Sequence, residues 1–204
     1  FALSQGFEED VSNAVSDHYL PLGNNSMTSK KPISYIVAIS DKIDTLVGFF
    51  LINEKPTSSK DPFALRRSAI GLLRTIIDNK LNLKLRNLIS YNIKLLEEQG
   101  VRKTNENSEN EILNFLKERM KNILKDKNIK NDIIEASISS YFSDNYFDLY
   151  KKNTLMNKYI NKEAGINAIS SYKRAFNIVE SAKENLSGRP DAVLFRKDEE
   201  KHLF

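Results

Sequence analysis

Two aspartates and one histidine are the residues of this sequence whose types could support metal or acid–base chemistry. Asp41 and Asp44 lie three positions apart, so on a helix their carboxylates share one face. Paired carboxylates can hold a metal ion or share a proton. Because Lys42 stands between them and no histidine neighbours them, a capping or salt-bridge role is the favoured interpretation. His18 precedes Pro21 at an expected helix end, where a histidine favours the helix dipole without catalytic duty.

A second chemical feature is a dense set of cations suited to phosphate binding. The set comprises Lys55, Lys60, Arg66, Arg67 and Arg74. Arg66 and Arg67 follow an expected helix start, whose free N–H groups also attract anions. Arg67 and Arg74 lie two helical turns apart and therefore share a face. Together they form a candidate phosphate-binding surface.

The same cations also admit a structural interpretation. Arg66 or Arg67 can pair with Asp41, Asp44 or Asp61 and hold two helices together, and spacing alone slightly favours this. A weaker version of the basic pattern occurs at Lys173 and Arg174, beside Phe176.

The elements that must position these residues are helices, because apolar residues recur at helical spacing almost everywhere and strand signals are weak. The sequence therefore predicts an all-α fold. We expect helices over residues 7–18, 33–50, from Asp61-Pro62 onward, 83–99, from Glu109 onward, 129–140, 144–160, 162–185 and from Asp198.

Local signals predict where some of these helices begin and end. Asp61 is an expected N-cap with Pro62 at the first helical position. Residues 108–111 match a capping box that places a helix start at Glu109. Gly100 and residues 187–190 are expected stops. Gly48, inside a helix, is expected to let another backbone come close.

Helical periodicity also predicts the side chains that face the core. They are Phe7, Val11, Val15, Val37, Ile43, Leu46, Val47, Phe50, Leu65, Ala69, Leu72, Leu73, Ile76, Ile77, Ile112, Phe115, Leu116 and Ile123.

Composition narrows the function classes. The 204 residues include no cysteine and only two histidines, which excludes disulfides, thiolate metal sites and cysteine nucleophiles, and leaves little room for histidine-based catalysis. No GxGxxG or GxxxxGK[ST] motif is present, and no apolar run approaches a membrane span. The net charge of +4 is uneven: residues 51–100 and 151–204 carry +4 each, and the intervening and N-terminal quarters are weakly acidic. A chain that opens on Phe1 is expected to be a fragment or a processed product.

Residues 35–48 and 54–67 closely resemble the β subunit of bacterial heterotetrameric glycyl-tRNA synthetases. The most specific run is Lys60-Asp61-Pro62-Phe63-Ala64-Leu65-Arg66-Arg67. The resemblance is strong over residues 2–78, fades over 79–160 and returns at 171–179, which look like the entry helix of a DALR-type anticodon-binding domain. It implies three parts: a degenerate HD-like domain over 1–80, a helical body over 81–160, and the first helices of the anticodon-binding domain over 161–204.

In this family the first part is similar to an HD domain, the helical fold of metal-dependent phosphohydrolases. Some members carry a His-Asp pair just before the glycine that matches Gly6, but here these positions read Ser4 and Gln5, which are poor metal ligands. Asp41 matches the distal carboxylate of the pattern. We therefore expect a vestigial pocket without metal or hydrolase activity, formed by Ser4, Gln5, Asp41 and Asp44.

The resemblance further implies where the chemistry takes place. In these synthetases glycine is activated with ATP and Mg²⁺ on the separate α subunit, and the β subunit mainly recognises tRNA. We therefore expect no cofactor and no catalytic residue in this chain, tRNA(Gly) and the α subunit as partners, a cytoplasmic heterotetramer as the whole enzyme, no membrane contact, and a chain that is monomeric by itself.

Three functions compete on these grounds. The leading one is a tRNA-binding part of a glycine–tRNA ligase, with the basic residues on phosphates. The second is an active HD-type phosphohydrolase, which Ser4 and Gln5 argue against. The third is a scaffold that docks the α subunit, which an exposed apolar patch would favour over a basic groove.

Overall fold

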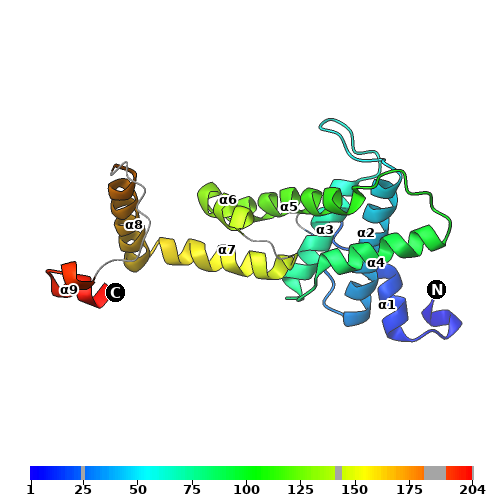
Figure 1. Ribbon diagram of the computed structural model, residues 1–204. Helices are drawn as coiled ribbons and strands as arrows, with labels where there is room; N and C mark the ends of the chain where they lie inside the picture. The colour runs from blue at the N-terminus through cyan, green and yellow to red at the C-terminus, as the bar shows by residue number, and fades with distance from the viewer. Residues whose placement is uncertain (24–25, 141–143, 182–191, 204) are drawn as a thin grey trace. The chain divides into compact units, whose positions relative to one another are not determined.

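The computed structural model of the chain describes residues 1–23, 26–140, 144–181 and 192–203, and every regular element in these ranges is helical, as the sequence predicts. Figure 1 shows the elements in chain order. They are the short 3₁₀ turn η1 (Leu3–Gln5), α1 (Glu9–Asp17), α2 (Pro32–Leu51), α3 (Leu65–Asp78), α4 (Leu85–Glu98), α5 (Ser108–Asp126), α6 (Asn131–Ser140), α7 (Tyr146–Ile160), α8 (Glu163–Ser181), the 3₁₀ turn η2 (Ala192–Leu194) and α9 (Asp198–Leu203).

Residues 1–158 form one compact unit and residues 159–204 a second. Within the first unit α2 is the central element, since it packs against α1, α3, α4 and α5, and α3 also packs against α5 (Figure 1). The largest fully buried side chains come from these helices: Leu46, Leu51, Leu65, Leu72, Leu73, Ile76, Leu85, Ile89, Ile112, Leu116, Met120 and Leu124. Helices from both sides of residue 80 therefore share one core. The three-part division at 80 and 160 stays a prediction.

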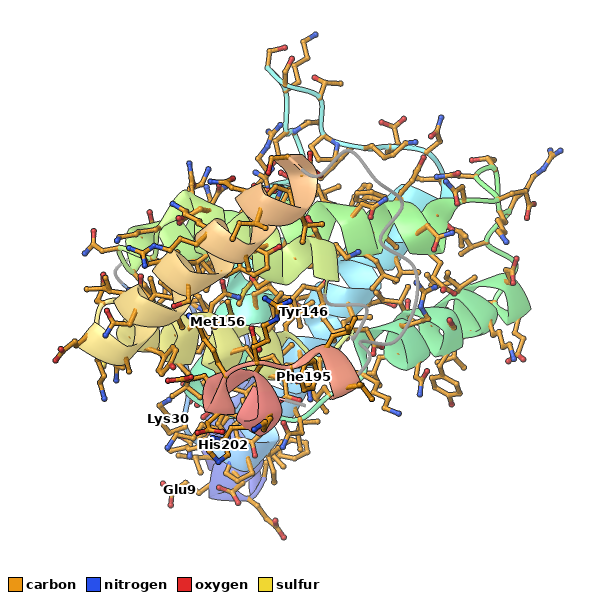
Figure 2. The ribbon with its side chains drawn as sticks, turned by 60° about the vertical axis from the view of Figure 1, so that its left-hand side comes forward. Glu9, Lys30, Tyr146, Met156, Phe195 and His202 are labelled. Carbon is orange, nitrogen blue, oxygen red and sulfur yellow. The ribbon has the colours of Figure 1, made fainter. Side chains whose placement is uncertain are left out.

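The second half of the first unit is fastened to this core by buried polar contacts. The Tyr146 hydroxyl, at the start of α7, donates a hydrogen bond to the Leu113 carbonyl of α5 at 3.1 Å. On the same helix, the Asn153 side chain accepts a hydrogen bond from the Ser137 hydroxyl of α6 at 2.8 Å. In Figure 2 Tyr146 lies among the helices, whereas Glu9 lies at the outer edge of α1.

The start of α3 differs from the prediction, although Asp61 does cap the helix. The Asp61 carboxylate accepts hydrogen bonds from the N–H groups of Leu65 and Arg66 at 2.8 and 3.0 Å. Pro62 is therefore not the first helical residue; it opens a turn, Ala64 adopts a left-handed conformation, and the helix begins at Leu65. The prediction was wrong because the aspartate reaches its N–H partners across this turn.

The predicted capping box at the start of α5 does not form. The helix begins at Ser108, and the Ser108 hydroxyl is buried without a hydrogen-bond partner. The Glu111 carboxylate, which a capping box would turn back toward the helix start, instead accepts hydrogen bonds from Lys55 at 2.8 Å and from Asn105 at 2.6 Å. A long-range ion pair thus replaces the local cap.

Most of the predicted core is buried, but the first helix is an exception. Phe7, Val11 and Val15 are all exposed, and Ala14 is the buried residue of α1. Val37 on α2 is also exposed, with 39% of its surface accessible, and Phe115 is half-buried. A Cβ on Gly48 would meet nothing within 4 Å, so no other backbone approaches it and that prediction was wrong. The predicted stop at 187–190 lies outside the described residues.

The second unit has little core of its own among the described residues. Gly165 is the buried residue of α8, where a Cβ would clash with the Tyr159 carbonyl oxygen. Tyr172, Phe176 and Val179 leave large fractions of their side chains exposed. Nowhere in the described ranges is a helix long and apolar enough to cross a membrane.

Candidate functional site

The two aspartates of the predicted pocket lie on the exposed side of α2, and the lysine between them is buried. The Lys42 ammonium donates a hydrogen bond to the His18 carbonyl at 2.8 Å, and burial lowers the pKa of this lysine, with the Asp41 carboxylate opposing the shift. Asp44 accepts a hydrogen bond from the Asn92 amide of α4 at 3.3 Å. The His18 ring nitrogen contacts the Val15 carbonyl at 2.9 Å, which is the helix-end role that the sequence favoured.

The other two members of the predicted pocket lie on η1, away from these contacts. Ser4 and Gln5 are exposed, and the Ser4 hydroxyl donates to the Phe1 carbonyl at 2.8 Å. Asp41 lines two hollows, and neither is lined by Ser4 or Gln5. No group of three or more histidine, cysteine or carboxylate side chains that could hold a metal occurs in the described part of the chain.

Three of the five clustered cations are used inside the chain. Lys55 forms an ion pair with Glu111 at 2.8 Å. Arg66 donates to the Thr57 carbonyl and lies 3.8 Å from the Asp61 carboxylate. Arg74 donates to the carbonyls of Gly23 and Ser26 at 2.8 and 2.6 Å. These three side chains therefore brace the loops before α2 and α3, which is a structural role.

The remaining cations are exposed, and among the described residues none has an ion-pair or hydrogen-bond partner for its charged group. Lys60 lies in the loop before α3, and Arg67 lies in the first turn of α3. Arg67 lines two hollows, of about 410 and 200 Å³, and the smaller one is also lined by Asp41 and Lys42. Lys173 and Arg174 lie on exposed positions of α8.

The structure also contains a surface that the sequence did not predict. An open groove of about 750 Å³ lies between α1 and α2. We call it the α1–α2 groove; its lining includes Val11, Ala14, Val15 and His18 from α1, Ile33, Val37, Ser40, Asp41 and Asp44 from α2, and Asn92 from α4. The sequence signal for this groove is the helical periodicity of Val11, Val15 and Val37. That periodicity assigns these apolar residues to the core, but in the structure they are exposed and line the groove.

The described residues form an all-helical fold, with exposed cations at the start of α3 and an open groove beside α2. The sequence matches the family model described as glycyl-tRNA synthetase beta subunit over residues 1–139. The glycine–tRNA ligase beta subunit of Rickettsia canadensis (strain McKiel) is 37% identical over 204 residues, which cover all of this chain and 29% of that protein. The beta subunit of Ruegeria sp. (strain TM1040) is 36% identical over 185 residues, covering 90% of this chain and 25% of that protein. The chain therefore belongs to the glycyl-tRNA synthetase beta subunit family.

The chain corresponds to only part of these beta subunits. The chain spans about a quarter to a third of the length of the curated relatives that it matches. The beta subunit of Rhodospirillum centenum (strain ATCC 51521 / SW), for example, is 36% identical over 207 residues, which are 99% of this chain and 28% of that protein.

Proposed function

We propose that this chain acts, as part of a glycine–tRNA ligase beta subunit, in the attachment of glycine to tRNA(Gly). The observation that carries the proposal is the match to this family along nearly the whole chain. On this proposal the chain has no catalytic residue of its own, and ATP and Mg²⁺ are used by the α subunit of a cytoplasmic heterotetramer.

Within that activity, we propose that the exposed cations contact tRNA phosphates. Lys60 and Arg67 flank the N-terminal end of α3, and their charged groups have no partner among the described residues. Phosphate contacts of this kind position an RNA without reading its bases. Lys173 and Arg174, on α8, are candidates for separate phosphate contacts. Lys55, Arg66 and Arg74 become less suitable, since their charges are already used within the chain.

The test compares tRNA(Gly) binding by the whole α/β enzyme carrying Lys60→Glu, Arg67→Glu or Lys94→Glu in the β subunit. Lys94 is the matched control, because it is an exposed lysine on α4, away from the basic set. Replacing a phosphate-binding cation weakens binding and reduces the salt slope of log K by about one. We expect both effects at Lys60 and Arg67, and neither at Lys94. Equal binding by all three variants would remove the phosphate-contact assignment.

A second role, docking of the α subunit, is favoured by one specific observation. The α1–α2 groove, an open hollow of about 750 Å³, exposes four valine and isoleucine side chains, each with 39–59% of its surface accessible. Both roles are compatible with one subunit, although the two surfaces adjoin: the hollow of about 200 Å³ that Arg67 lines is also lined by Asp41 of the groove. The purified subunits would separate them: groove variants should change subunit association, and cation variants should change tRNA binding.

A further inference from the structure

The loop that joins α2 to α3, residues 52–64, projects away from the helices of the first unit. It is the cyan segment at the top of both views (Figure 1, Figure 2). At its tip the chain bends at Ser58 and Ser59, and residues 57–60 are all exposed. We call the loop the α2–α3 loop and residues 58–60 its tip. Because an exposed loop has no core to order it, any defined shape must come from specific contacts.

Thr57 and Lys60 close the bend at the tip. The Thr57 N–H donates a hydrogen bond to the Lys60 carbonyl at 2.9 Å, and the Lys60 N–H donates to the Thr57 hydroxyl oxygen at 3.2 Å. The Thr57 carbonyl accepts a hydrogen bond from the Arg66 guanidinium of α3. Thr57 therefore holds the two arms of the bend together and ties the bend to a helix.

Further contacts hold the base of the α2–α3 loop. The rings of Phe49, near the end of α2, and Phe63 are stacked with their centroids 4.0 Å apart. Lys55 forms an ion pair with Glu111 of α5 at 2.8 Å, and the Asp61 carboxylate caps the start of α3. The loop is thus anchored on three helices, and these two carboxylates are engaged within the chain rather than at the tip.

The tip itself presents hydrogen-bond donors that the chain does not use. The backbone N–H and hydroxyl groups of Ser58 and Ser59, and the Lys60 ammonium, have no hydrogen-bond or ion-pair partner among the described residues. No carboxylate occurs within residues 55–60. Serine hydroxyls, lysine ammonium groups and successive backbone N–H groups at a bend are the donors that bind phosphate oxygens. The donor set therefore fits an anion.

We propose that the tip of the α2–α3 loop holds one phosphate of the tRNA backbone, with the donors of Ser58, Ser59 and Lys60 directed to its oxygens and with Thr57 as the positioning residue. This rests on the phosphate contact proposed above for Lys60, and adds the donors beside it and the residue that orders them. Because the bend is closed without RNA, little entropy is lost in ordering it on binding. The contact is independent of base identity.

The first test measures the dissociation constant of tRNA(Gly) from the whole α/β enzyme that carries Ser58→Ala/Ser59→Ala in the β subunit. Ser139→Ala is the matched control, because Ser139 is an exposed serine of α6 without a hydrogen-bond partner in the described ranges. We expect the double variant to raise the dissociation constant about fivefold or more, and the control to change it less than about twofold. Equal effects of the two would overturn the proposal.

The salt dependence in the same assay separates a direct contact from a collapse of the loop. The serine variant removes no charge, so its slope of log K against log salt concentration should equal that of the unsubstituted enzyme. A slope that falls as it does in Lys60→Glu would mean that the serines only hold Lys60 in place, which overturns their assignment as phosphate ligands.

Thr57→Val tests the positioning role, since it removes the hydroxyl that accepts the Lys60 N–H and keeps the β-branched shape. Thr57 is exposed, so the fold should persist. We expect weaker tRNA binding and a lower salt slope, because the Lys60 contact is lost with the bend. In a Lys60→Ala background the same substitution should cost less. Fully additive effects of the two substitutions would overturn the positioning role.

The phosphate is located with tRNA(Gly) molecules that each carry one methylphosphonate, which removes the charge of a single phosphate. At one position the change should weaken binding to the unsubstituted enzyme and have no further effect on the Ser58→Ala/Ser59→Ala enzyme. The absence of such a position overturns the proposal, as does a serine variant that changes subunit association instead of tRNA binding.

The outcomes also separate this inference from the function on which it rests. If Lys60→Glu and Arg67→Glu weaken tRNA binding and the serine variant does not, the inference about the tip fails alone. If none of these variants weakens binding, the phosphate contacts proposed for the exposed cations fail with it.

Discussion

Lys42 of α2 contacts both α1 and α3 in the N-terminal part of the fold. Its side chain is buried beneath the junction of α1, α2 and α3, and its ammonium group donates to the His18 carbonyl at the end of α1. Gly71 of α3 lies so close that a Cβ there would come within 2.9 Å of the Lys42 Cε. The lysine is therefore a structural link between three helices. A buried ammonium group also makes stability depend on pH.

The pH dependence has a definite sign. Burial lowers the folded-state pKa of Lys42 below its ordinary value of 10.5. Between these two pKa values the unfolded chain binds more protons than the folded one, so stability rises with pH, by at most about 1.4 kcal/mol per pH unit. We expect the free energy of unfolding, measured with urea, to rise as the pH approaches 10.5 from below. In the Lys42→Met variant this contribution to the rise should be absent. Parallel pH profiles of the two proteins would contradict this.

Replacing glycine by alanine should change the stability of the fold in opposite directions at Gly48 and Gly71. At Gly48 of α2 a Cβ meets nothing within 4 Å, so Gly48→Ala should stabilise the fold by up to about 1 kcal/mol through helix propensity. At Gly71 the Cβ would come within 2.9 Å of the Lys42 Cε, and a shift of this buried side chain would disturb the hydrogen bond of its ammonium to the His18 carbonyl. Overpacking should exceed the propensity gain, and Gly71→Ala should destabilise by about 1 kcal/mol. The free energies of unfolding of the two variants, measured with urea, test this. If Gly71→Ala stabilised the fold as Gly48→Ala does, Lys42 would move aside without cost.

Among the elements, α3 depends most on a single cap. The two oxygens of Asp61 satisfy the first two N–H groups of the helix, and α3 carries much of the core through Leu65, Leu72 and Leu73. Asp61→Ala should therefore lower the free energy of unfolding by about 1–2 kcal/mol, and Asp61→Asn by less, since an amide oxygen still accepts one bond. Ser59→Ala, an exposed change in the same loop, serves as the control for thermal melting. A loss at Ser59 equal to that at Asp61 would contradict the assignment.

The elements also show how far a sequence pattern reaches. The run around Asp61 predicted a helix start, since a cap is a local interaction within a few residues. The box at 108–111 failed because Glu111 pairs with Lys55, which is 56 residues away and invisible to a local pattern. Periodicity predicted that Val11, Val15 and Val37 face the core, and this was wrong, since all three are exposed. It could not say what covers an apolar face, and in this structure these residues line the α1–α2 groove.

The roles of the cations in the candidate site could not be predicted from local sequence patterns either. Composition identified the cations around α3, but it could not distinguish an arginine that braces a loop from one that is free. Arg74 donates to carbonyls 48 and 51 residues earlier in the chain, whereas the Arg67 guanidinium has no partner among the described residues. Which cations remain available for phosphate depends on the tertiary path of loops, and a helical pattern carries no information about that path.

At the scale of the whole molecule, the two units differ in how much core they contain. Residues 1–158 bury a continuous set of leucine, isoleucine and valine side chains from α2, α3, α4 and α5. The described part of residues 159–204 exposes nearly every side chain of α8, including Tyr172 and Phe176, whose rings lie 6.0 Å apart on the helix surface. A helix that buries little of its apolar face receives most of its stability from whatever packs on that face.

The last prediction follows from this difference. A protein of residues 1–158 should unfold in a single cooperative transition, because its core supplies enough apolar burial for independent stability. A peptide of residues 159–204 should show low helicity and a shallow, non-cooperative melt, since short isolated helices are marginal in water. Circular dichroism melts of the two chains measure this directly. A sharp transition in the 159–204 peptide would contradict it, and would mean that the exposed face of α8 is closed by its own short chain rather than by the rest of a longer subunit.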